Sequence, residues 1–397
     1  MITSLFLLLG SAHVLGALGR RLGLPALAGH MVAGILIGPS LLGWITPDAS
    51  LVAVADIAVF FVVLAAGLEM RLQHVTDVLR GRGAVSLFAG FILPVCVGGA
   101  IALAFGLAPI PATVVALCIA VTALPVALQI LSAFDMLGTR IAHVTVSGAL
   151  LSDVLVFLIL GVLIELSTGT VRPPAAAVGI AFLKLGGLVL AIAAAHFACV
   201  HVMKRRAAAT TSSSDVSPGN LAFVLLFVLG LGALSELLGF HFVIGSFFAA
   251  MMVTPELIGE HSFERLERTS ELLTAGLFGP VFLAYQGLQF HLDTLGQPVM
   301  IAVLIVGAVA AKLFSGYLVG RMQHMSHHDA WGVGIVMNAR GVVELVVASI
   351  AFRAALVDGE VFSMLLIVGM VTTVLTPLML SAWQKSATPL PGRSRPG

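Results

Sequence analysis

The sequence predicts an all-α polytopic membrane protein with about thirteen transmembrane helices. Of its 397 residues, 59% are hydrophobic and only 10% are charged, and its mean hydropathy is +1.11. Soluble globular chains carry about 25% charged residues, so the composition leaves no room for a sizeable soluble domain. The net charge of +1 gives no indication of a nucleic-acid partner.

The expected spans follow one another at short intervals along the whole chain. Each is close to the ~20 apolar residues that a membrane-crossing helix needs, allowing for tilt. In chain order they are 2–18, 25–41, 51–69, 83–106, 111–133, 140–166, 174–203, 219–239, 241–256, 272–289, 298–320, 330–354 and 360–383. The first residues lack the basic segment and cleavage site of a secretory signal, so we expect the first span to be retained.

Basic residues are distributed unequally between the two alternating sets of loops. One set, with the tail, holds Arg20, Arg21, Arg71, Arg80, Arg82, Arg140, Lys204, Arg205, Arg206, Arg265, Arg268, Arg321, Lys385, Arg393 and Arg395. The other set holds only Arg172 and Arg353. Because cytoplasmic loops carry the excess of Lys and Arg, we expect a multi-pass protein of the inner (cell) membrane with its N-terminus outside and its C-terminus in the cytoplasm.

A polar, low-complexity stretch divides the spans into two halves. It predicts a first membrane half at 1–203, a cytoplasmic linker at 204–218, a second membrane half at 219–383 and a cytoplasmic tail at 384–397. The second to sixth spans and the ninth to thirteenth begin on opposite sides of the membrane. This order permits an inverted-topology repeat over approximately 25–166 and 241–383.

Asp153 lies near the middle of an apolar run, 144–164, that carries no other charge. A carboxylate at bilayer depth costs at least about 2.5 kcal/mol, so such residues mark transport or binding sites by default. If the protein moves an ion, Asp153 is the first candidate to bind it.

Two spans contain helix-breaking residues deep inside, at corresponding places in the two halves. The first has Pro125, which lacks an N–H and crowds the preceding turn. The second combines Asn338, Arg340, Gly341 and Glu344. Interrupted helices in transporters expose carbonyls and helix ends that coordinate ions near the midplane. The alternative is that the breaks only shape the packing of the helices.

Several stretches carry a family resemblance that covers nearly the whole chain. They are LPALAG at 24–29 leading to AGILIGP at 33–39, AGLEM at 66–70, GSFFAA at 245–250, TALPV at 122–126 followed by Asp153, and MNARGVVE at 337–344. These stretches resemble the second family of monovalent cation:proton antiporters. That family includes Kef-type potassium efflux systems, bacterial sodium/proton exchangers and plant CHX exchangers.

The resemblance implies a core domain with two crossed, discontinuous helices, together with a dimerisation domain that makes a homodimer. It implies that Asp153 binds cation and proton in turn, that Thr122 and nearby carbonyls are cation ligands, and that Lys312 is a membrane-embedded cation opposite them. Two departures stand out. Many relatives have two adjacent acids or an amide-acid pair where this chain has Ser152 and Asp153, and we expect no soluble regulatory domain of the kind that follows the membrane part of Kef systems.

The chemistry of these residues predicts obligate exchange. A proton or a monovalent cation can each neutralise Asp153, and only the neutralised site crosses a low-dielectric barrier at low cost. Oxygens of Asp153, Ser152 and Thr122, with the carbonyls near Pro125, suit a hard ion such as Na⁺ or K⁺. Because Ser152 removes one titratable charge, we expect one proton per cation and electroneutral exchange in a secondary transporter. We expect no enzyme activity and no cofactor, and a role in pH or salt homeostasis.

Other interpretations stay open at this point. Lys312 can snorkel toward the cytoplasmic end of its span, and Arg340 and Glu344, four residues apart, can simply pair on one helix face or also support the ends of the broken helix. A cation channel or a non-transporting membrane sensor would use the same helices. A channel would dissipate a cation gradient without moving protons in the opposite direction.

Three further features are less specific. His324, His327 and His328 have a spacing that permits a metal or pH-sensing site but also suits a solvated loop. The stretch 256–271 predicts an amphipathic interfacial helix. Lys184, inside the seventh span, has no partner that the sequence identifies.

Overall fold

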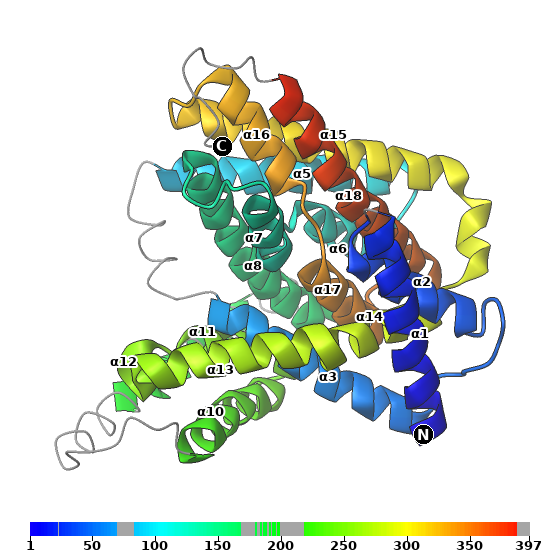
Figure 1. Cartoon of the computed structure of the whole chain (residues 1–397), viewed down its shortest axis with the longest axis vertical. Helices are drawn as coiled ribbons and strands as arrows, with labels where there is room; N and C mark the ends of the chain where they lie inside the picture. The colour runs from blue at the N-terminus through cyan, green and yellow to red at the C-terminus, as the bar shows by residue number, and fades with distance from the viewer. Residues whose placement is uncertain are drawn as a thin grey trace, which may run out of the picture.

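The structure is a computed structural model that describes residues 1–22, 24–69, 83–167 and 218–386, with short pieces between 179 and 198. All regular elements in these ranges are helices (Figure 1). They are α1 (Ile2–Arg21), α2 (Ala26–Ile37), α3 (Ala49–Glu69), α5 (Gly83–Ala104), α6 (Pro109–Ala120), α7 (Leu124–Ala133), α8 (Arg140–Ser167), α10 (Pro218–Leu237), α11 (Phe242–Met251), α12 (Pro255–Ile258), α13 (Glu260–Leu273), the π-helix η1 (Thr274–Phe278), α14 (Gly279–Leu288), the 3₁₀-helix η2 (Leu292–Gly296), α15 (Pro298–Met322), α16 (His327–Met337), α17 (Val342–Arg353) and α18 (Gly359–Ser386). Almost all of the linker predicted at 204–218 and of the tail predicted at 384–397 lies outside the described residues, so those boundaries stay predictions.

Every predicted span other than 174–203, much of which lies outside the described residues, coincides with a helix or a broken pair of helices. Within the described ranges, six helices are long and apolar enough to cross a membrane, namely α1, α3, α5, α8, α15 and α18. The pair α16 and α17, bent by 44°, adds up to a seventh. Other predicted spans match shorter apolar helices, such as α2, α6 and α11. The all-helical membrane class is confirmed, whereas the number thirteen stays a prediction.

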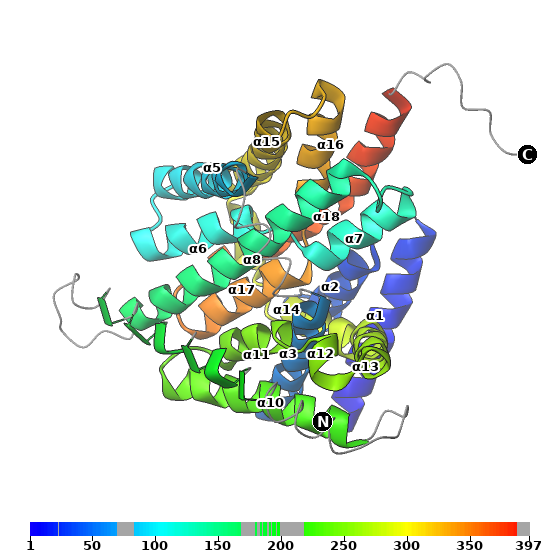
Figure 2. The same ribbon diagram turned by 90° about the vertical axis from the view of Figure 1, so that its left-hand side faces the viewer.

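The helices pack as two bundles. We define the core bundle as α5, α6, α7, α8, α15, α16, α17 and α18, and the flanking bundle as α1, α2, α3 and α10 to α14 with η1. Helices contact their own bundle far more than the other, which they meet mainly through α14 with α17 and α18 with α2. In Figure 2 the core bundle fills the upper part of the molecule, while α3 and α10 to α13 lie below it.

The core bundle contains the same order of elements twice. A long helix, α5, is followed by the interrupted pair α6 and α7 and then by the long helix α8. The second set is α15, the pair α16 and α17, and α18. Both helix breaks that the sequence indicates therefore fall in the middle element of a set.

Glycines allow two pairs of helices to approach closely. A Cβ added at Gly34 of α2 would lie 1.8 Å from the carbonyl oxygen of Ala284 in α14, and one at Gly316 of α15 would lie 2.4 Å from the Cα of Gly334 in α16. Small residues give membrane helices this kind of contact because lipid provides no hydrophobic force between them. The second pair lies one turn from Lys312.

Two secondary expectations are resolved. The predicted amphipathic helix is present as α12 and α13, and α13 buries Phe263 and Leu266 while most of its charged residues stay exposed. Lys184, for which the sequence offered no partner, forms an ion pair of 2.7 Å with Glu165 near the end of α8. The residues are nineteen positions apart, so only the packing of the chain reveals the pair.

Candidate functional site

The two interrupted helices meet at their breaks. Helix α6 ends at Ala120 and α7 begins at Leu124, while α16 ends at Met337 and α17 begins at Val342. The backbone N–H of Ala123 donates a hydrogen bond of 3.0 Å to the carbonyl of Ala339. The Thr122 hydroxyl donates one of 2.9 Å to the carbonyl of Met337. The two unwound segments therefore satisfy part of each other's backbone hydrogen bonding, which a membrane interior requires.

Local sequence explains both interruptions. Pro125 lies in the first turn of α7, where its missing N–H costs nothing because the first N–H groups of a helix have no intrahelical partner. Gly341 caps α17, and a Cβ at that position would lie 2.6 Å from the side chain of Val126. The lack of a side chain at Gly341 thus also permits the two breaks to come into contact.

Two buried cations cover the carbonyl end of α6. Arg340 donates hydrogen bonds of 2.7 Å to the carbonyls of Cys118 and Ile119. Lys312 donates to the carbonyl of Ala120, the next in the chain. The last carbonyls of a helix lack intrahelical donors and carry the negative end of its dipole. Positive groups from α15 and from the opposite break therefore stabilise this end.

Arg340 also forms an ion pair of 2.9 Å with Glu344, and both side chains are fully buried. The sequence left open whether these residues only pair or also support a helix end. The structure shows the ion pair together with the bonds to α6 carbonyls, so Arg340 does both. The helix end that it contacts belongs to the other broken helix, which spacing along the chain does not indicate.

Lys312 is fully buried, and its ammonium points into the crossing rather than toward an end of α15. Besides Ala120, it donates a hydrogen bond of 2.8 Å to the hydroxyl of Thr122. That hydroxyl therefore accepts from Lys312 and donates to Met337. One of the predicted cation ligands is already bonded to a protein cation in this structure.

Asp153 lies on α8 beside the crossing and is fully buried. Neither of its carboxylate oxygens has a hydrogen-bond partner in the described part of the chain. The preceding Ser152 donates to the carbonyl of Ala149 at 2.8 Å and accepts from the backbone N–H of Thr122 at 3.4 Å. Lys312 attracts the carboxylate electrostatically, but the described residues show no ion pair between them within 4.0 Å. A buried carboxylate without a donor costs several kcal/mol unless an ion or proton joins it.

The structure thus brings together most of the residues singled out from the sequence. Thr122 contacts Ser152, Lys312 and Met337 directly, and Asp153 follows Ser152 on α8. Asn338 lies within the second break, and its amide donates to Thr376 of α18 at 3.0 Å. The sequence reasoning missed the threonines of α18, although the unusual run TTVLTP at 372–377 was a visible signal.

The histidine cluster does not converge on one point. His327 hydrogen-bonds the hydroxyl of Tyr317 at 2.7 Å, and the ring of His328 stacks on Trp383 with centroids 4.3 Å apart. Among the described residues, no group of three or more His, Cys, Asp or Glu side chains could hold a metal ion. The structure therefore gives no support to a metal site at this turn.

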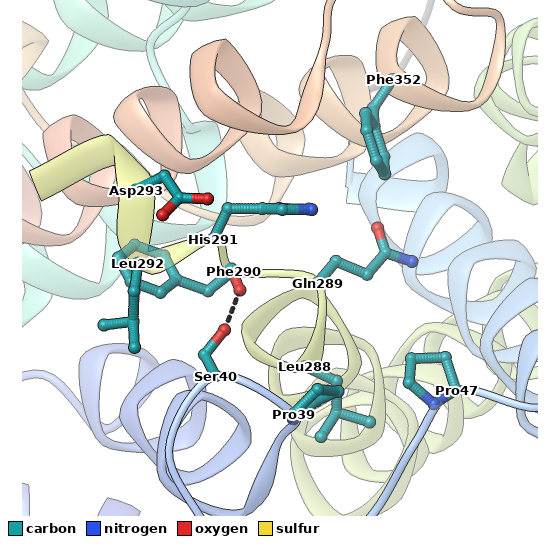
Figure 3. Close-up of a pocket in the computed structure, with 10 residues that line it drawn as sticks. All are labelled: Pro39, Ser40, Pro47, Leu288, Gln289, Phe290, His291, Leu292, Asp293 and Phe352. Atoms are coloured by element: carbon teal, nitrogen blue, oxygen red, sulfur yellow. Dashed lines mark hydrogen bonds between the residues drawn. The ribbon is translucent and has the colours of Figure 1, made fainter. Parts of the chain in front are cut away.

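A cavity of about 540 Å³ lies elsewhere, between the two bundles (Figure 3). It is lined by Pro39, Ser40, Pro47, Leu288, Gln289, Phe290, His291, Leu292, Asp293 and Phe352. Phe352 of α17 is about 16 Å along the helix from the break, at 1.5 Å per residue. None of the residues at the crossing lines this cavity.

Beside the cavity an ion pair joins the bundles. Arg353, next to Phe352, pairs with Asp56 of α3 and lies 5.9 Å from the ring centre of Tyr285 in α14. Charged and aromatic groups thus hold the end of a core helix against two flanking helices. The sequence places Arg353 in one set of loops and does not identify Asp56 as its partner.

Comparison with known proteins matches residues 7–385 to the family described as sodium/hydrogen exchanger, transmembrane. A Na(+)/H(+) antiporter of Enterococcus hirae is 26% identical over 385 residues, which are 96% of this chain and 97% of that protein. The Na(+)/H(+)-K(+) antiporter GerN of Bacillus cereus is 27% identical over 94% of both chains. Cation/H(+) antiporter 20 of Arabidopsis thaliana is 24% identical over 98% of this chain, which spans 49% of the plant protein.

The fold is also that of a solved antiporter. The sodium proton antiporter MjNhaP1 from Methanocaldococcus jannaschii superposes with a TM-score of 0.68 over 96% of both chains, at 16% identity. The match of nearly the whole chain to one family model confirms the resemblance seen in the sequence motifs. This chain therefore belongs to the sodium/hydrogen exchanger family and is a secondary transporter rather than an enzyme.

Proposed function

We propose that this protein exchanges a monovalent cation, Na⁺ or K⁺, for H⁺ by alternating access, with both ions competing for Asp153. The observation that carries the proposal is the fully buried carboxylate whose two oxygens have no hydrogen-bond partner in the described chain, beside two crossed helix breaks. Relatives that match along nearly the whole chain are a Na(+)/H(+) antiporter and a Na(+)/H(+)-K(+) antiporter, which supports the two substrates.

The ligands for the cation come from three neighbouring residues. Asp153 supplies a carboxylate, and Ser152 and Thr122 supply hydroxyl oxygens. The backbone N–H of Thr122 donates to the Ser152 hydroxyl and so links these two residues. Such hard oxygen donors suit Na⁺ or K⁺. The Thr122 hydroxyl now accepts a hydrogen bond from the ammonium of Lys312. It becomes available to the incoming cation when this ammonium moves aside.

The buried charges support electroneutral exchange. Asp153, Lys312, Arg340 and Glu344 are the charged side chains buried at the crossing, and in ionised form they sum to zero. Adding one proton or one monovalent cation to Asp153 gives the same net charge of plus one. The loaded site then carries equal charge in both directions, provided that Lys312 keeps its proton, which its bond to the carbonyl of Ala120 favours.

The two bundles support alternating access. The core bundle contains both helix breaks and Asp153, and it meets the flanking bundle through few helices. Movement of one bundle against the other would expose the crossing to each side in turn. A channel would need a continuous path, and its cation flux would not depend on opposing protons.

The test is an exchange assay on the purified full-length protein in liposomes. An imposed proton gradient is followed while Na⁺, K⁺, Li⁺ or Rb⁺ is added in turn. We expect cation-dependent proton flux for the wild type, little change under an imposed membrane potential, and complete loss in Asp153→Asn. The control is Glu165→Gln, which removes another acid of α8 that lies outside the crossing. Retained exchange in Asp153→Asn would refute Asp153 as carrier, and strong acceleration by potential would refute electroneutrality.

We also propose the finer arrangement expected from the sequence: the N-terminus outside, the C-terminus in the cytoplasm, and a homodimer in the inner membrane. The loop charges support the orientation. Exposed apolar residues on α1, including Ile2, Phe6 and Val14, support contact with lipid or a second copy. Labelling of single cysteines in intact cells with an impermeant reagent tests the orientation, and mass measurement in detergent tests the dimer.

A further inference from the structure

Helix α18 presents three buried threonines near the second helix break. Thr372, Thr373 and Thr376 are at most 3% exposed, and two of them contact the unwound segment 338–341. Nothing in the proposed ion chemistry uses these hydroxyls. Their hydrogen bonds nevertheless reach the residues that fix the cation ligands.

The hydroxyl of Thr376 makes two hydrogen bonds, one as donor and one as acceptor. It donates to the carbonyl of Thr372 in its own helix at 2.9 Å and accepts from the side-chain amide of Asn338 at 3.0 Å. A hydroxyl has a single hydrogen, and that of Thr376 already points to the carbonyl of Thr372. The hydroxyl can therefore only accept a hydrogen bond from Asn338. This bond therefore fixes which way the amide of Asn338 faces.

Thr373 holds the same segment at a second point. Its hydroxyl lies 2.6 Å from the carbonyl of Gly369 and 3.0 Å from the carbonyl of Arg340. The one hydrogen is shared between its own helix and the break. Arg340 is the residue whose guanidinium covers the end of α6, so this contact secures the backbone from which that side chain extends.

The next contacts lead to the cation ligands. Asn338 lies between Met337 and Ala339, whose carbonyls accept from the Thr122 hydroxyl and from the Ala123 N–H. A shift of Asn338 moves both acceptors and with them the segment that carries Thr122. The N–H groups of Asn338 and Ala339 donate to carbonyls at the end of α16, and the contacts with α18 hold the segment from the other side.

We propose that Thr373 and Thr376 are positioning residues of the antiporter: they hold the second break so that Thr122 is placed to bind the transported cation. This inference rests on the proposed function of the crossing. It assigns to α18 a role in cation affinity that acts through Asn338 and Arg340, without contact between α18 and the ion.

The experiment measures cation-dependent proton exchange in liposomes over a range of Na⁺ and K⁺ concentrations, with the thermal midpoint of unfolding of each variant. Thr376→Val and Thr373→Val keep the side-chain shape but remove the hydroxyl. We expect each to raise the KM for the cation about 3- to 10-fold, the loss that one buried hydrogen bond causes, with a smaller change in maximal rate. Thr376→Ser restores the hydroxyl and should return KM to within about 2-fold of wild type.

Thr372→Val is the matched control. Among the described residues, the Thr372 hydroxyl bonds only to the carbonyls of Val368 and Gly369 in its own helix, so its loss removes a buried hydroxyl from α18 without touching the break. An equal rise of KM in Thr372→Val, or a lower thermal midpoint with unchanged KM in the other two variants, would overturn the proposal. If Thr376→Val does not fold, Thr373→Val decides the question alone.

The same assay separates this inference from the proposed function. Loss of exchange in Asp153→Asn with an unchanged KM in the threonine variants refutes the positioning role and leaves the ion site intact. Exchange that survives in Asp153→Asn refutes the ion site and the positioning role together.

Discussion

The ammonium of Lys312 donates a hydrogen bond of 2.8 Å to the hydroxyl of Thr122. A side-chain cation therefore occupies oxygen atoms that a transported cation would use, while the carboxylate of Asp153 nearby has no hydrogen-bond partner in the described residues. Lys312 is thus both a counter-charge to Asp153 and a competitor for the ligands of the cation. Its removal should alter affinity rather than abolish exchange.

We expect Lys312→Gln to lower the KM for Na⁺ or K⁺ by about 10-fold or more, since removing a unit charge a few ångströms away is worth well over 1 kcal/mol at an effective dielectric constant of 20. Exchange should stay insensitive to membrane potential, because proton and cation still give Asp153 equal charge. Initial rates at varied cation concentration measure the first effect, and a valinomycin-imposed potential measures the second. A raised KM would show that Lys312 helps rather than competes.

Arg340→Lys should destabilise the protein despite keeping the charge. A lysine cannot reproduce the planar fork that bonds Cys118, Ile119 and Glu344 together. Each hydrogen bond to a charged group that is lost costs about 1.5 to 3 kcal/mol. The thermal midpoint in detergent should fall clearly below that of Glu165→Gln, which disrupts a less buried pair. Equal midpoints for the two variants would contradict this assignment.

We expect the contact between α15 and α16 to be disrupted by any side chain larger than that of glycine. Gly316→Val should lower the thermal midpoint strongly and weaken exchange, because its Cβ would overlap the backbone at Gly334 and push apart the helices next to Lys312. Gly230→Ala on α10 is the control. Its added Cβ meets nothing within 4 Å, and alanine favours a helix by about 1 kcal/mol over glycine, so stability there should be unchanged or higher.

The ion pair between Asp56 and Arg353 should hold the two bundles together near the cavity. We expect Asp56→Arg alone to speed the reaction of a cysteine placed at Phe352 with an impermeant maleimide, in a background whose native cysteines are replaced by alanine. Like charges would then face each other between α3 and α17. The double exchange Asp56→Arg with Arg353→Asp restores the attraction and should return the rate toward wild type. If the double variant reacts as fast as the single one, the pair does not link the bundles.

Much of the fold was predictable from the chain. Periodic apolar segments identify membrane helices because the bilayer imposes one length and forbids unpaired backbone groups. Pro125 and the run around Asn338 identify the interruptions, because a residue without an N–H or without a Cβ acts locally on the helix that contains it. The exceptional cost of a charge in lipid marks Asp153 without any structural information.

Contacts between distant segments were not predictable in this way. Spacing suggested that Arg340 pairs with Glu344, and it does, but its bonds to Cys118 and Ile119 bridge 222 and 221 positions. The partner of Lys184 and the hydrogen bond from Asn338 to Thr376 were likewise not predictable from the sequence. A polar side chain in a membrane interior must find some partner, and the sequence does not say which.

The sequence by itself determined that this is a helical membrane protein with one uncompensated acid and two broken spans, since those properties depend on composition and on local backbone chemistry. Only the tertiary structure decided which groups of the two breaks bond one another, that two cations cover the end of α6, and that Lys312 rather than Asp153 bonds Thr122. These outcomes depend on which helix ends lie within about 3 Å of a donor, and that distance is set by the packing of helices far apart in the chain.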